Sequence, residues 1–259
     1  MALFEIRSLT KRFDGRAVLE AVDLDIHRGE FLTLIGRSGC GKTLLLKHLV
    51  GLVSPTEGEI CFDGERVSGL SERAWIGVRR RIGVLFQAGA LFDSLSVADN
   101  VAYGLREAGE VSETVIAEQV SRALAQVDLP GTERMWPASL SGGMRKRVAL
   151  ARAIALRPEV VLYDEPTEGL DPINVSRVNR LLLRLREEQG VTTIVATQNM
   201  RSAFSVSDRI AFIHEGRVAM VGSPAQLEAS NDPRLAPFVR SSQLRAKTRP
   251  SVPDGEALG

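Results

Sequence analysis

The stretch from Gly36 to Thr43 constrains this chain more than any other. It matches the phosphate-loop pattern G-x-x-x-x-G-K-[ST] at every specified position, in the order Gly36, Arg37, Ser38, Gly39, Cys40, Gly41, Lys42 and Thr43. An apolar, strand-like run at 31–35 precedes the pattern, and a helix-like run at 44–50 follows it. Strand, loop and helix in this order predict a site for the phosphates of a nucleotide, and a chance glycine-rich turn is the weaker interpretation.

Each specified residue type has a physical role in such a loop. Glycines let backbone N–H groups turn inward toward phosphate oxygens, and the N-terminus of the next helix adds roughly half a positive elementary charge. Lys42 can reach the β- and γ-phosphates, and the hydroxyl of Thr43 can hold Mg²⁺. We interpret Cys40 as a small residue that fills the loop, in preference to a reactive thiol.

The composition limits the classes of protein to consider. The chain has 259 residues, of which 44% are hydrophobic and 25% charged, and this suits one large domain or a domain with a subdomain. A formal net charge of +1 gives no reason to expect nucleic acid as a partner, and two cysteines favour a reducing cytosol over a disulfide framework. Neither a signal peptide nor an apolar run of ~18 residues is apparent, so we expect any membrane role to go through a partner.

Hydrophobic periodicity predicts strands of two kinds. Half-exposed antiparallel strands, with alternating apolar and polar residues, are expected at 3–9 and 21–26, and a short strand is expected at 59–62. Buried strands, which read as near-continuous apolar runs, are expected at 31–35, 82–86, 160–164 and 192–197. Near the C-terminal end, two strands are expected to pair at 210–214 and 218–221.

Helices are predicted between these strands and in one insertion. The insertion spans about 91–137, where β-branched residues do not cluster, with helices at 96–106 and 112–127. Other helices are expected at 71–80, 145–156 and 172–189, and a last helical piece is expected to begin at 231–233. The tail from about 244 is rich in Arg, Ser and Pro and is expected to be disordered.

Polar residues at two further places point to the same kind of ligand. Ser141, Gly142 and Gly143 begin the predicted helix at 145–156, and a glycine-rich helix start is an anion site. Asp164 and Glu165 follow a buried strand, and ligands of parallel sheets bind at the carboxyl ends of the strands. We therefore interpret these two carboxylates as functional and not as solvated turn residues.

Phe13 lies in an expected turn at 12–15 and is open to two interpretations. Its ring could stack on a purine, because every base offers a π-face. It could equally be an ordinary turn residue that covers the edge of a sheet, and the segment by itself favours that interpretation.

The chain contains six motifs in one order. Because of these motifs it resembles an ATP-binding-cassette ATPase. The motifs are Walker A at 36–43, the Q-loop Gln87, the signature at 140–144, Walker B at 160–165, the D-loop at 169–171 and the switch position Gln198. The resemblance covers about residues 3–221. A narrower resemblance, to the ATPases of Mla/Mce-type bacterial lipid transporters, is carried by 86–92, 97–102, 231–234 and Phe238.

The family resemblance implies a fold and a domain layout. The expected fold is α/β, with a P-loop (RecA-like) ATPase core, an N-terminal antiparallel β subdomain and an inserted α-helical subdomain. Residues 1–240 would form the ATPase domain, with the core and β subdomain at 1–90 and 157–240, and the helical subdomain at 91–156. Residues 241–259 would form a disordered tail, although 233–239 could begin an arm that reaches a second subunit.

The resemblance also implies roles for individual residues toward ATP and Mg²⁺. Phe13 matches the aromatic residue that stacks on adenine, which reverses the interpretation from its own segment. The residues implied to bind the nucleotide are Phe13, the loop from Gly36 to Thr43 and the signature residues Ser141, Gly142 and Gly143. The implied metal ligands are Thr43, Gln87 and Asp164, the last usually through water. The implied catalytic residues are Lys42, Gln87, Glu165, which polarises the attacking water, and Gln198.

Two anion-binding helix starts serve one nucleotide if two chains meet head to tail about a two-fold axis. We therefore expect a homodimer that sandwiches ATP and opens on hydrolysis, which would move a membrane partner through the region at 87–92. The resemblance implies an integral-membrane permease as that partner, with an Mce-domain substrate-binding protein and a small STAS-domain protein as further partners. The implied location is peripheral, on the cytoplasmic face of the inner membrane.

Gln198 departs from the family pattern, which carries His at the switch position, and Asn199 replaces the usual following Asp. A carboxamide can hydrogen-bond the γ-phosphate but cannot hold a proton as imidazole can. Gln can still orient water, as it does in small GTPases. We expect slower hydrolysis, and the alternatives are a drifted site with little activity and a substitution made to trap a state.

Three functions remain open at this point. The first is the ATPase subunit of a membrane transporter, with lipid as the expected cargo. The second is a soluble cassette ATPase of translation or DNA repair, although those carry two cassettes or a long coiled-coil insertion. The third is a slow nucleotide-gated scaffold, which only Gln198 supports.

Overall fold

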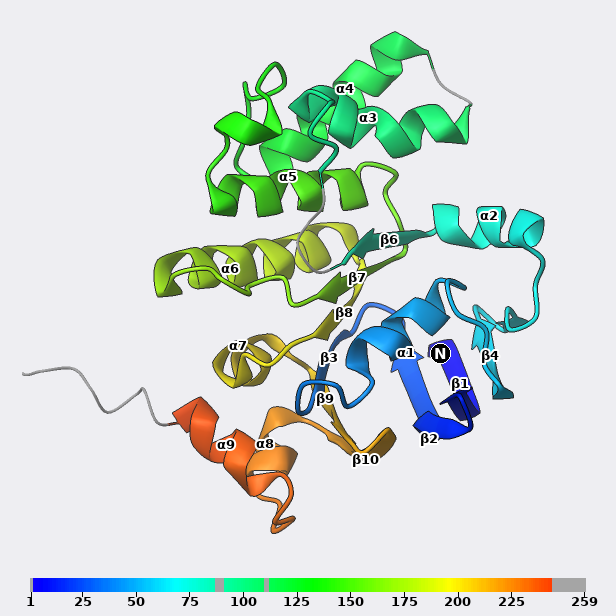
Figure 1. Ribbon diagram of the computed structural model, residues 1–259. Coiled ribbons are helices and arrows are strands. Elements are labelled where there is room, and N and C mark those ends of the chain that lie inside the picture. The colour runs from blue at the N-terminus through cyan, green and yellow to red at the C-terminus, as the bar shows by residue number, and fades with distance from the viewer. Residues whose placement is uncertain (1, 87–90, 110–111, 244–259) are drawn as a thin grey trace, which may run out of the picture.

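Five parallel strands form the centre of the molecule, and β10 extends their sheet at one edge (Figure 1). The computed structural model describes residues 2–86, 91–109 and 112–243. The strand order is β10-β9-β3-β8-β7-β6, and β10 runs antiparallel to β9. The strands are β3 (Phe31–Ile35), β6 (Ile82–Leu85), β7 (Val160–Asp164), β8 (Thr192–Ala196), β9 (Arg209–His214) and β10 (Arg217–Gly222).

This sheet is covered on both faces, which explains the continuous apolar runs in its sequence. Side chains of successive residues point to opposite faces of a strand. Val161 and Tyr163 of β7 accordingly lie in one hydrophobic core with the helices of the upper layer. Val160 and Leu162 lie in a second core, with α1 (Lys42–Leu49) and the antiparallel sheet.

The second sheet is antiparallel, in the order β2-β1-β4-β5. Its strands are β1 (Ala2–Phe13), β2 (Arg16–His27), β4 (Glu57–Phe62) and β5 (Glu65–Arg66). The prediction of antiparallel strands is confirmed, but β1 and β2 are both longer than the predicted 3–9 and 21–26. Register shifts interrupt their pairing, and Ser8 and Ala21 adopt φ 46, so bulges bend the strands without ending them.

A layer of helices lies above the parallel sheet (Figure 1). It contains α3 (Val97–Ala108), α4 (Glu113–Gln126), the short η1 (Pro137–Ser139) and α5 (Gly142–Ile154). The predicted helices at 96–106 and 112–127 are confirmed, and the side chains of Ser96 and Ser112 cap them. The predicted start of the next helix at 145 is wrong, because Ser141 is its N-cap and the two glycines form its first turn.

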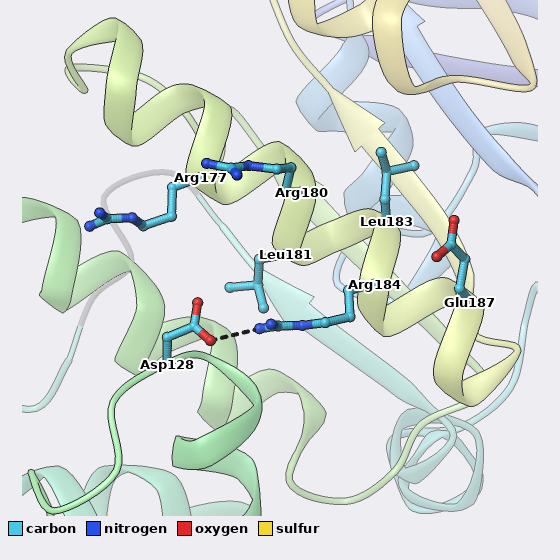
Figure 2. Close-up of a pocket in the computed structure, with 7 residues that line it drawn as sticks. All are labelled: Asp128, Arg177, Arg180, Leu181, Leu183, Arg184 and Glu187. Atoms are coloured by element: carbon cyan, nitrogen blue, oxygen red, sulfur yellow. Dashed lines mark hydrogen bonds and ion pairs between the residues drawn. The ribbon is translucent and has the colours of Figure 1, made fainter.

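Two arginine side chains hold the end of α4, one from α6 (Pro172–Gln189) below the helical layer (Figure 2) and one from α5 within it. Arg184 of α6 donates to the carbonyl of Gln126 at 2.8 Å and to Oδ1 of Asp128 at 2.9 Å. Arg147 of α5 donates to the carbonyls of Val127 and Asp128 at 3.2 and 3.0 Å. These guanidinium groups satisfy carbonyls at the end of α4 that have no partner within the helix.

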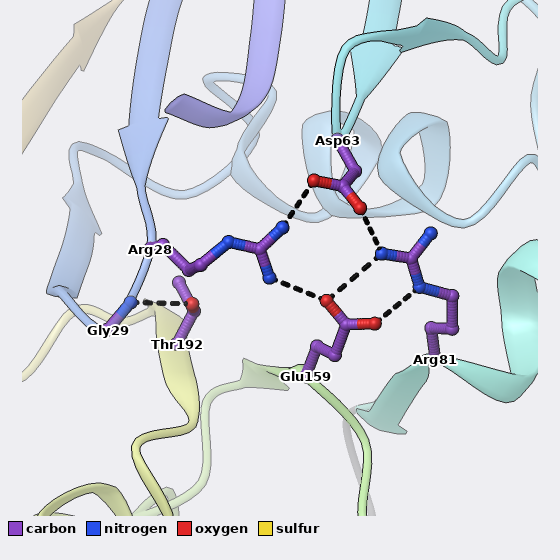
Figure 3. A network of polar contacts seen from close by, with 6 residues as sticks. All are labelled: Arg28, Gly29, Asp63, Arg81, Glu159 and Thr192. Carbon is purple, nitrogen blue, oxygen red and sulfur yellow. Dashed lines mark hydrogen bonds and ion pairs between the residues drawn. The ribbon is translucent and has the colours of Figure 1, made fainter. Parts of the chain in front are cut away.

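A second ionic network ties together four segments on the side of the core shown in Figure 3. Glu159, just before β7, accepts from Arg28 at 2.6 Å and from Nε of Arg81 at 2.5 Å. Asp63, in the turn after β4, accepts from Arg81 at 2.5 Å and is also paired with Arg28. The guanidinium groups lower the pKa of Glu159, because hydrogen bonds from Arg81 and Arg28 outweigh the opposing effect of burial. The network therefore fastens the antiparallel sheet to the start of β6 and β7.

The remaining helices are short, apart from α6. The predicted α6 is confirmed, and Asp171 caps it. The helix predicted at 71–80 is confirmed as α2 (Glu72–Arg80). The sequence did not predict α7 (Met200–Val206) and α8 (Pro224–Glu228), which are only one to two turns long.

The C-terminal helix α9 (Ala236–Gln243) packs against the parallel sheet, and the rings of Phe238 and Phe212 lie 5.1 Å apart. The tail predicted to be disordered from 244 lies outside the described residues. Every helix of the described residues is too short or too polar to cross a membrane.

Together the two sheets and the helical layer confirm the predicted α/β fold, with an antiparallel sheet and an inserted helical part.

Candidate active site

Three neighbouring parallel strands carry the predicted site residues at their carboxyl ends. Leu34 of β3 pairs with Ala196 of β8, and Asp164 of β7 pairs with the same Ala196. Because parallel strands end at the same edge, the loop after β3 lies beside the acids at the end of β7 and the polar residues after β8.

The phosphate loop has a backbone that only glycine fits at two of its positions. Gly36 adopts φ +151, and a Cβ there would lie 2.3 Å from the carbonyl oxygen of Ile213. Gly41 adopts φ +107, and a Cβ there would lie 2.5 Å from a methyl group of Leu19. The loop can therefore turn tightly and deliver the chain to the N-terminus of α1, where unpaired backbone N–H groups attract anions.

Lys42 is 6% exposed and folds back over the loop. Its Nζ donates to the carbonyl of Gly36 at 2.8 Å and to that of Arg37 at 3.1 Å. The Sγ atom of Cys40 lies 4.0 Å from the same nitrogen. Burial raises the pKa of the Cys40 thiol, which fits the predicted loop-filling role better than a thiolate nucleophile.

Thr43 and Asp164 meet where α1 approaches β7. Oγ1 of Thr43 donates to Oδ1 of Asp164 at 3.1 Å. Asp164 is 1% exposed, and its Oδ2 is buried without a hydrogen-bond partner among the described residues. Burial raises the pKa of Asp164, against the opposing effects of the Thr43 hydroxyl and the Lys42 charge.

Glu165 is held in an unusual backbone conformation with one carboxylate oxygen fixed. It adopts φ 49, a left-handed conformation that is uncommon for a residue with a side chain. Its Oε2 accepts from Oγ1 of Thr197 at 3.0 Å and from the backbone N–H of Gln198 at 3.1 Å. Its Oε1 is buried and has no partner among the described residues.

These two unpartnered oxygens test whether the residues fit Mg²⁺ and water. A buried polar atom without a partner costs about 1–3 kcal/mol, so native structures seldom retain one without a ligand to fill it. Asp164 and Thr43 offer the hard oxygen ligands that Mg²⁺ prefers. The hydroxyl oxygen of Thr43 and the unpartnered Oδ2 of Asp164 therefore suit the ion as ligands. Oε1 of Glu165 suits a water molecule beside it as a hydrogen-bond acceptor.

The structure does not bring every predicted residue to this site. Phe13 is 48% exposed at the end of β1, and Nζ of Lys11 lies 5.1 Å from its ring centre. Ser141, Gly142 and Gly143 lie at the start of α5 in the helical layer, whereas α1 lies in the lower part of the molecule (Figure 1). Gln87 lies outside the described residues.

The side chain of Gln198 is exposed and lies in a hollow of about 360 Å³. Phosphate-loop residues and the C-terminal helix α9 line the same hollow, the latter through Phe238 and Ser241. Sequence reasoning missed this contribution of α9, and it missed Thr197 as the partner of Glu165. The only signal for Thr197 was a hydroxyl residue at the end of a buried strand.

Comparison with known proteins agrees with this arrangement. The sequence pattern of the ABC transporter family matches residues 19–168. The intermembrane phospholipid transport system ATP-binding protein MlaF of Haemophilus influenzae is 39% identical over 238 residues, which cover 92% of this chain and 90% of that protein. The sulfate/thiosulfate import ATP-binding protein CysA of Pseudomonas putida is 42% identical over 88% of this chain and 69% of that protein.

Solved structures show the same fold. An ATP-binding cassette, solved as a dimer in a post-hydrolysis state with ADP and Pi, has a TM-score of 0.79 and 31% identity, and covers 85% of this chain and 98% of its own. The structure of cbiO1 from Clostridium perfringens, part of the ABC transporter complex cbiONQ, has a TM-score of 0.83 and 30% identity, and covers 94% of this chain and 95% of its own. With the geometry of the site, these matches show that the chain is an ATP-binding, ATP-hydrolysing subunit that belongs to the ABC transporter family.

Proposed function

We propose that this chain supplies the energy for a membrane transporter that moves phospholipid or another lipid. The observation that carries the lipid assignment is the match to MlaF of Haemophilus influenzae, which covers 92% of this chain and 90% of that protein. MlaF of Escherichia coli matches over the same 92% of this chain at 37% identity. The sulfate/thiosulfate import ATP-binding protein CysA has a slightly higher sequence identity, 42%, although only 69% of that protein is covered. Sequence identity by itself therefore does not assign the cargo, which must be tested.

The proposed hydrolysis uses the carboxylate of Glu165. The Thr197 hydroxyl and the Gln198 N–H hold Oε2, which leaves Oε1 to accept a hydrogen bond from the attacking water. Oriented in this way, the water can attack the γ-phosphate in line, because positioning supplies most of the catalysis in phosphoryl transfer.

The residues proposed to bind the nucleotide are Phe13, Gly36, Arg37, Ser38, Gly39, Cys40, Gly41, Lys42 and Thr43. Of these, Lys42 would release the loop carbonyls it now bonds and turn to the β- and γ-phosphates. Thr43 and Asp164, with Gln87, would hold Mg²⁺, which when bound neutralises phosphate charge.

The second anion site requires a second chain. Ser141 and Gly142 are exposed at the start of α5, in a different layer from the phosphate loop of the same molecule (Figure 1). We propose that in a head-to-tail homodimer these residues, with Gly143, reach the γ-phosphate held by the other subunit. Loss of that phosphate would let the dimer open and drive an integral-membrane permease at the inner membrane.

The catalytic part is tested with Glu165→Gln, which keeps the shape of the side chain and removes its charge. We expect ATP binding to remain and kcat to fall by about 10²–10⁴-fold, the usual contribution of a general base. An ATP-dependent dimer should accumulate in size-exclusion chromatography. Glu188→Gln, on the exposed face of α6, is the control. Unchanged phosphate release in Glu165→Gln would contradict the assignment.

The cargo is tested with the complex purified from its native membrane through a tag on this chain. A polytopic permease should co-purify, and an Mce-domain protein and a small STAS-domain protein are the further partners we expect. After reconstitution in vesicles, ATP should drive transfer of fluorescent phosphatidylglycerol, and the Glu165→Gln complex should not support it. ATP-driven uptake of sulfate without lipid transfer would refute the lipid proposal and leave the ATPase assignment intact.

A further inference from the structure

A groove rich in arginine lies between α6 and the end of α4, away from the phosphate loop. It has a volume of about 630 Å³, and we call it the arginine groove. Its lining residues are Asp128, Arg177, Arg180, Leu181, Leu183, Arg184 and Glu187. Figure 2 shows the side chains of Arg177, Arg180 and Arg184 extending from successive turns of α6 toward the same side.

The charges in the arginine groove are not balanced. Arg184 is paired with Asp128, and Arg186 on the same helix is paired with Asp208 at 2.7 Å. Arg177 and Arg180 are exposed, and neither forms an ion pair with any residue of the described ranges.

Arg147 of α5 adds a further positive charge beside them. Its pKa is lowered, first by burial and then by the charge of Arg177. Asp128 and the exposed Glu187 offset two of the three lining arginines, so the groove together with Arg147 carries a net charge of +2, which favours an anionic occupant.

The geometry distinguishes an extended occupant from a small anion. Arg177 and Arg184 are seven residues apart, which is about 10 Å along a helix at roughly 1.5 Å per residue. The guanidinium groups are therefore spaced along the groove and do not converge on one point. Two leucines also line the groove, the buried Leu181 and the partly buried Leu183. Leucine side chains beside cations that are spaced along a helix suit a protein segment with hydrophobic and acidic side chains better than they suit free phosphate.

From this arrangement we propose that the arginine groove is a docking surface for an acidic segment of a partner protein. Carboxylates of that segment would bind Arg177 and Arg180, because each guanidinium group can donate two parallel N–H hydrogen bonds to one carboxylate. This contact goes beyond the proposed ATP sandwich and the permease, and it does not depend on the cargo being lipid.

The position of the groove gives such a partner a means to act on the ATPase. Arg184 holds the end of α4 to α6 through the carbonyl of Gln126, and Arg147 holds it to α5 through the carbonyls of Val127 and Asp128. A segment bound beside this joint would restrict how the helical layer moves against α6. We therefore expect the bound partner to change the ATPase rate, without touching the nucleotide.

The experiment uses the full chain in its native host, with the photo-cross-linker p-benzoyl-phenylalanine incorporated at the groove residue Glu187. Cross-linked peptides are identified by mass spectrometry. We expect a protein segment with at least two acidic residues within about two helical turns of the cross-link. In Arg177→Glu/Arg180→Glu the cross-link should fall at least about tenfold, because two repulsive contacts replace two attractive ones. Lysine at the partner's acidic positions should then restore it.

The control is Arg73→Glu/Arg201→Glu, which makes the same change of net charge at two exposed arginines outside the groove and should leave the cross-link intact. The proposal is overturned if no protein is cross-linked, if the captured segment lacks acidic residues, or if the cross-link remains in Arg177→Glu/Arg180→Glu. It is also overturned if the reciprocal lysines do not restore the contact. Flotation with phosphatidylglycerol vesicles that depends on Arg177 and Arg180 would assign the groove to lipid headgroups instead.

Discussion

Replacing Thr197 by valine tests whether its hydroxyl positions the catalytic carboxylate. Thr197 is 2% exposed, and its Oγ1 donates to Glu165 at 3.0 Å while accepting from the N–H of Asn199 at 3.0 Å. Valine has nearly the same shape, so the change removes these two hydrogen bonds and little packing. Thr197 is a positioning residue in this account, because it acts on the attacking water only through Glu165.

The expected magnitude follows from the kind of hydrogen bond that is lost. A hydrogen bond to a charged group contributes about 1.5–3 kcal/mol, and about 1.36 kcal/mol corresponds to tenfold in rate. Complete loss of orientation would therefore cost about 10- to 150-fold in kcat. The backbone N–H of Gln198 still holds Oε2 in the variant, so we expect the lower end, about tenfold.

The assay is steady-state ATPase activity of the purified chain over a range of pH. We expect kcat to fall with little change in KM for ATP, because the hydroxyl of Thr197 bonds to Glu165 and Asn199 and not to a residue of the phosphate loop. Thr197→Ser should restore the rate, and a thermal melt controls for lost stability. A raised KM with unchanged kcat, or full activity of Thr197→Val, would refute the reasoning.

Three further changes probe the switch position, a buried histidine and the ionic network. Gln198→His should raise kcat, because imidazole can hold a proton, and an unchanged ATPase rate would show that glutamine is already adequate. His48 is 1% exposed, and burial lowers its pKa, so the fold favours the neutral ring. Its contribution to stability is complete above the unfolded pKa of about 6.5 and is lost as the pH falls toward the lower folded pKa. On acidification from about pH 8 to about pH 5.5, urea melts should show a larger loss of unfolding free energy in the wild type than in His48→Asn, and equal losses would contradict this. Glu159→Gln should lower the free energy of unfolding by about 1 kcal/mol at low salt, since solvent screens these half-exposed pairs, and the loss should shrink at high salt. Glu188→Gln is the matched control for that measurement, and a loss that salt does not change would argue against an ionic cause.

Much of the core could be predicted because burial on two faces leaves a plain trace in sequence. The runs at 31–35 and 160–164 are mostly apolar, every residue in both is buried, and both are inner strands of the parallel sheet. The phosphate loop could also be predicted from sequence, because its backbone at Gly36 leaves no room for a side chain and therefore requires glycine. Local rules of this kind also placed α6, where Asp171 and Pro172 mark the start.

The rest depends on contacts between distant segments. A threonine at the end of a buried strand gives no sign that it will meet Glu165, because that contact arises only when β7 and β8 pair. The bulges in β1 and β2 were not predicted, because no particular residue type marks an extra residue in a strand. The arginine groove could not be predicted from sequence either, because it forms only where Arg177 of α6 and Asp128 of the helical layer come together.

The pairing of β3 has a consequence for how the protein is made. Leu32 pairs with Ile194 on one side and with Arg209 on the other, although the phosphate loop follows directly after this strand. A growing chain on the ribosome therefore carries its phosphate loop long before the flanking strands exist. Until β8 and β9 have emerged, β3 lacks both of its parallel neighbours, and its unpaired strand edges favour chaperone binding and aggregation.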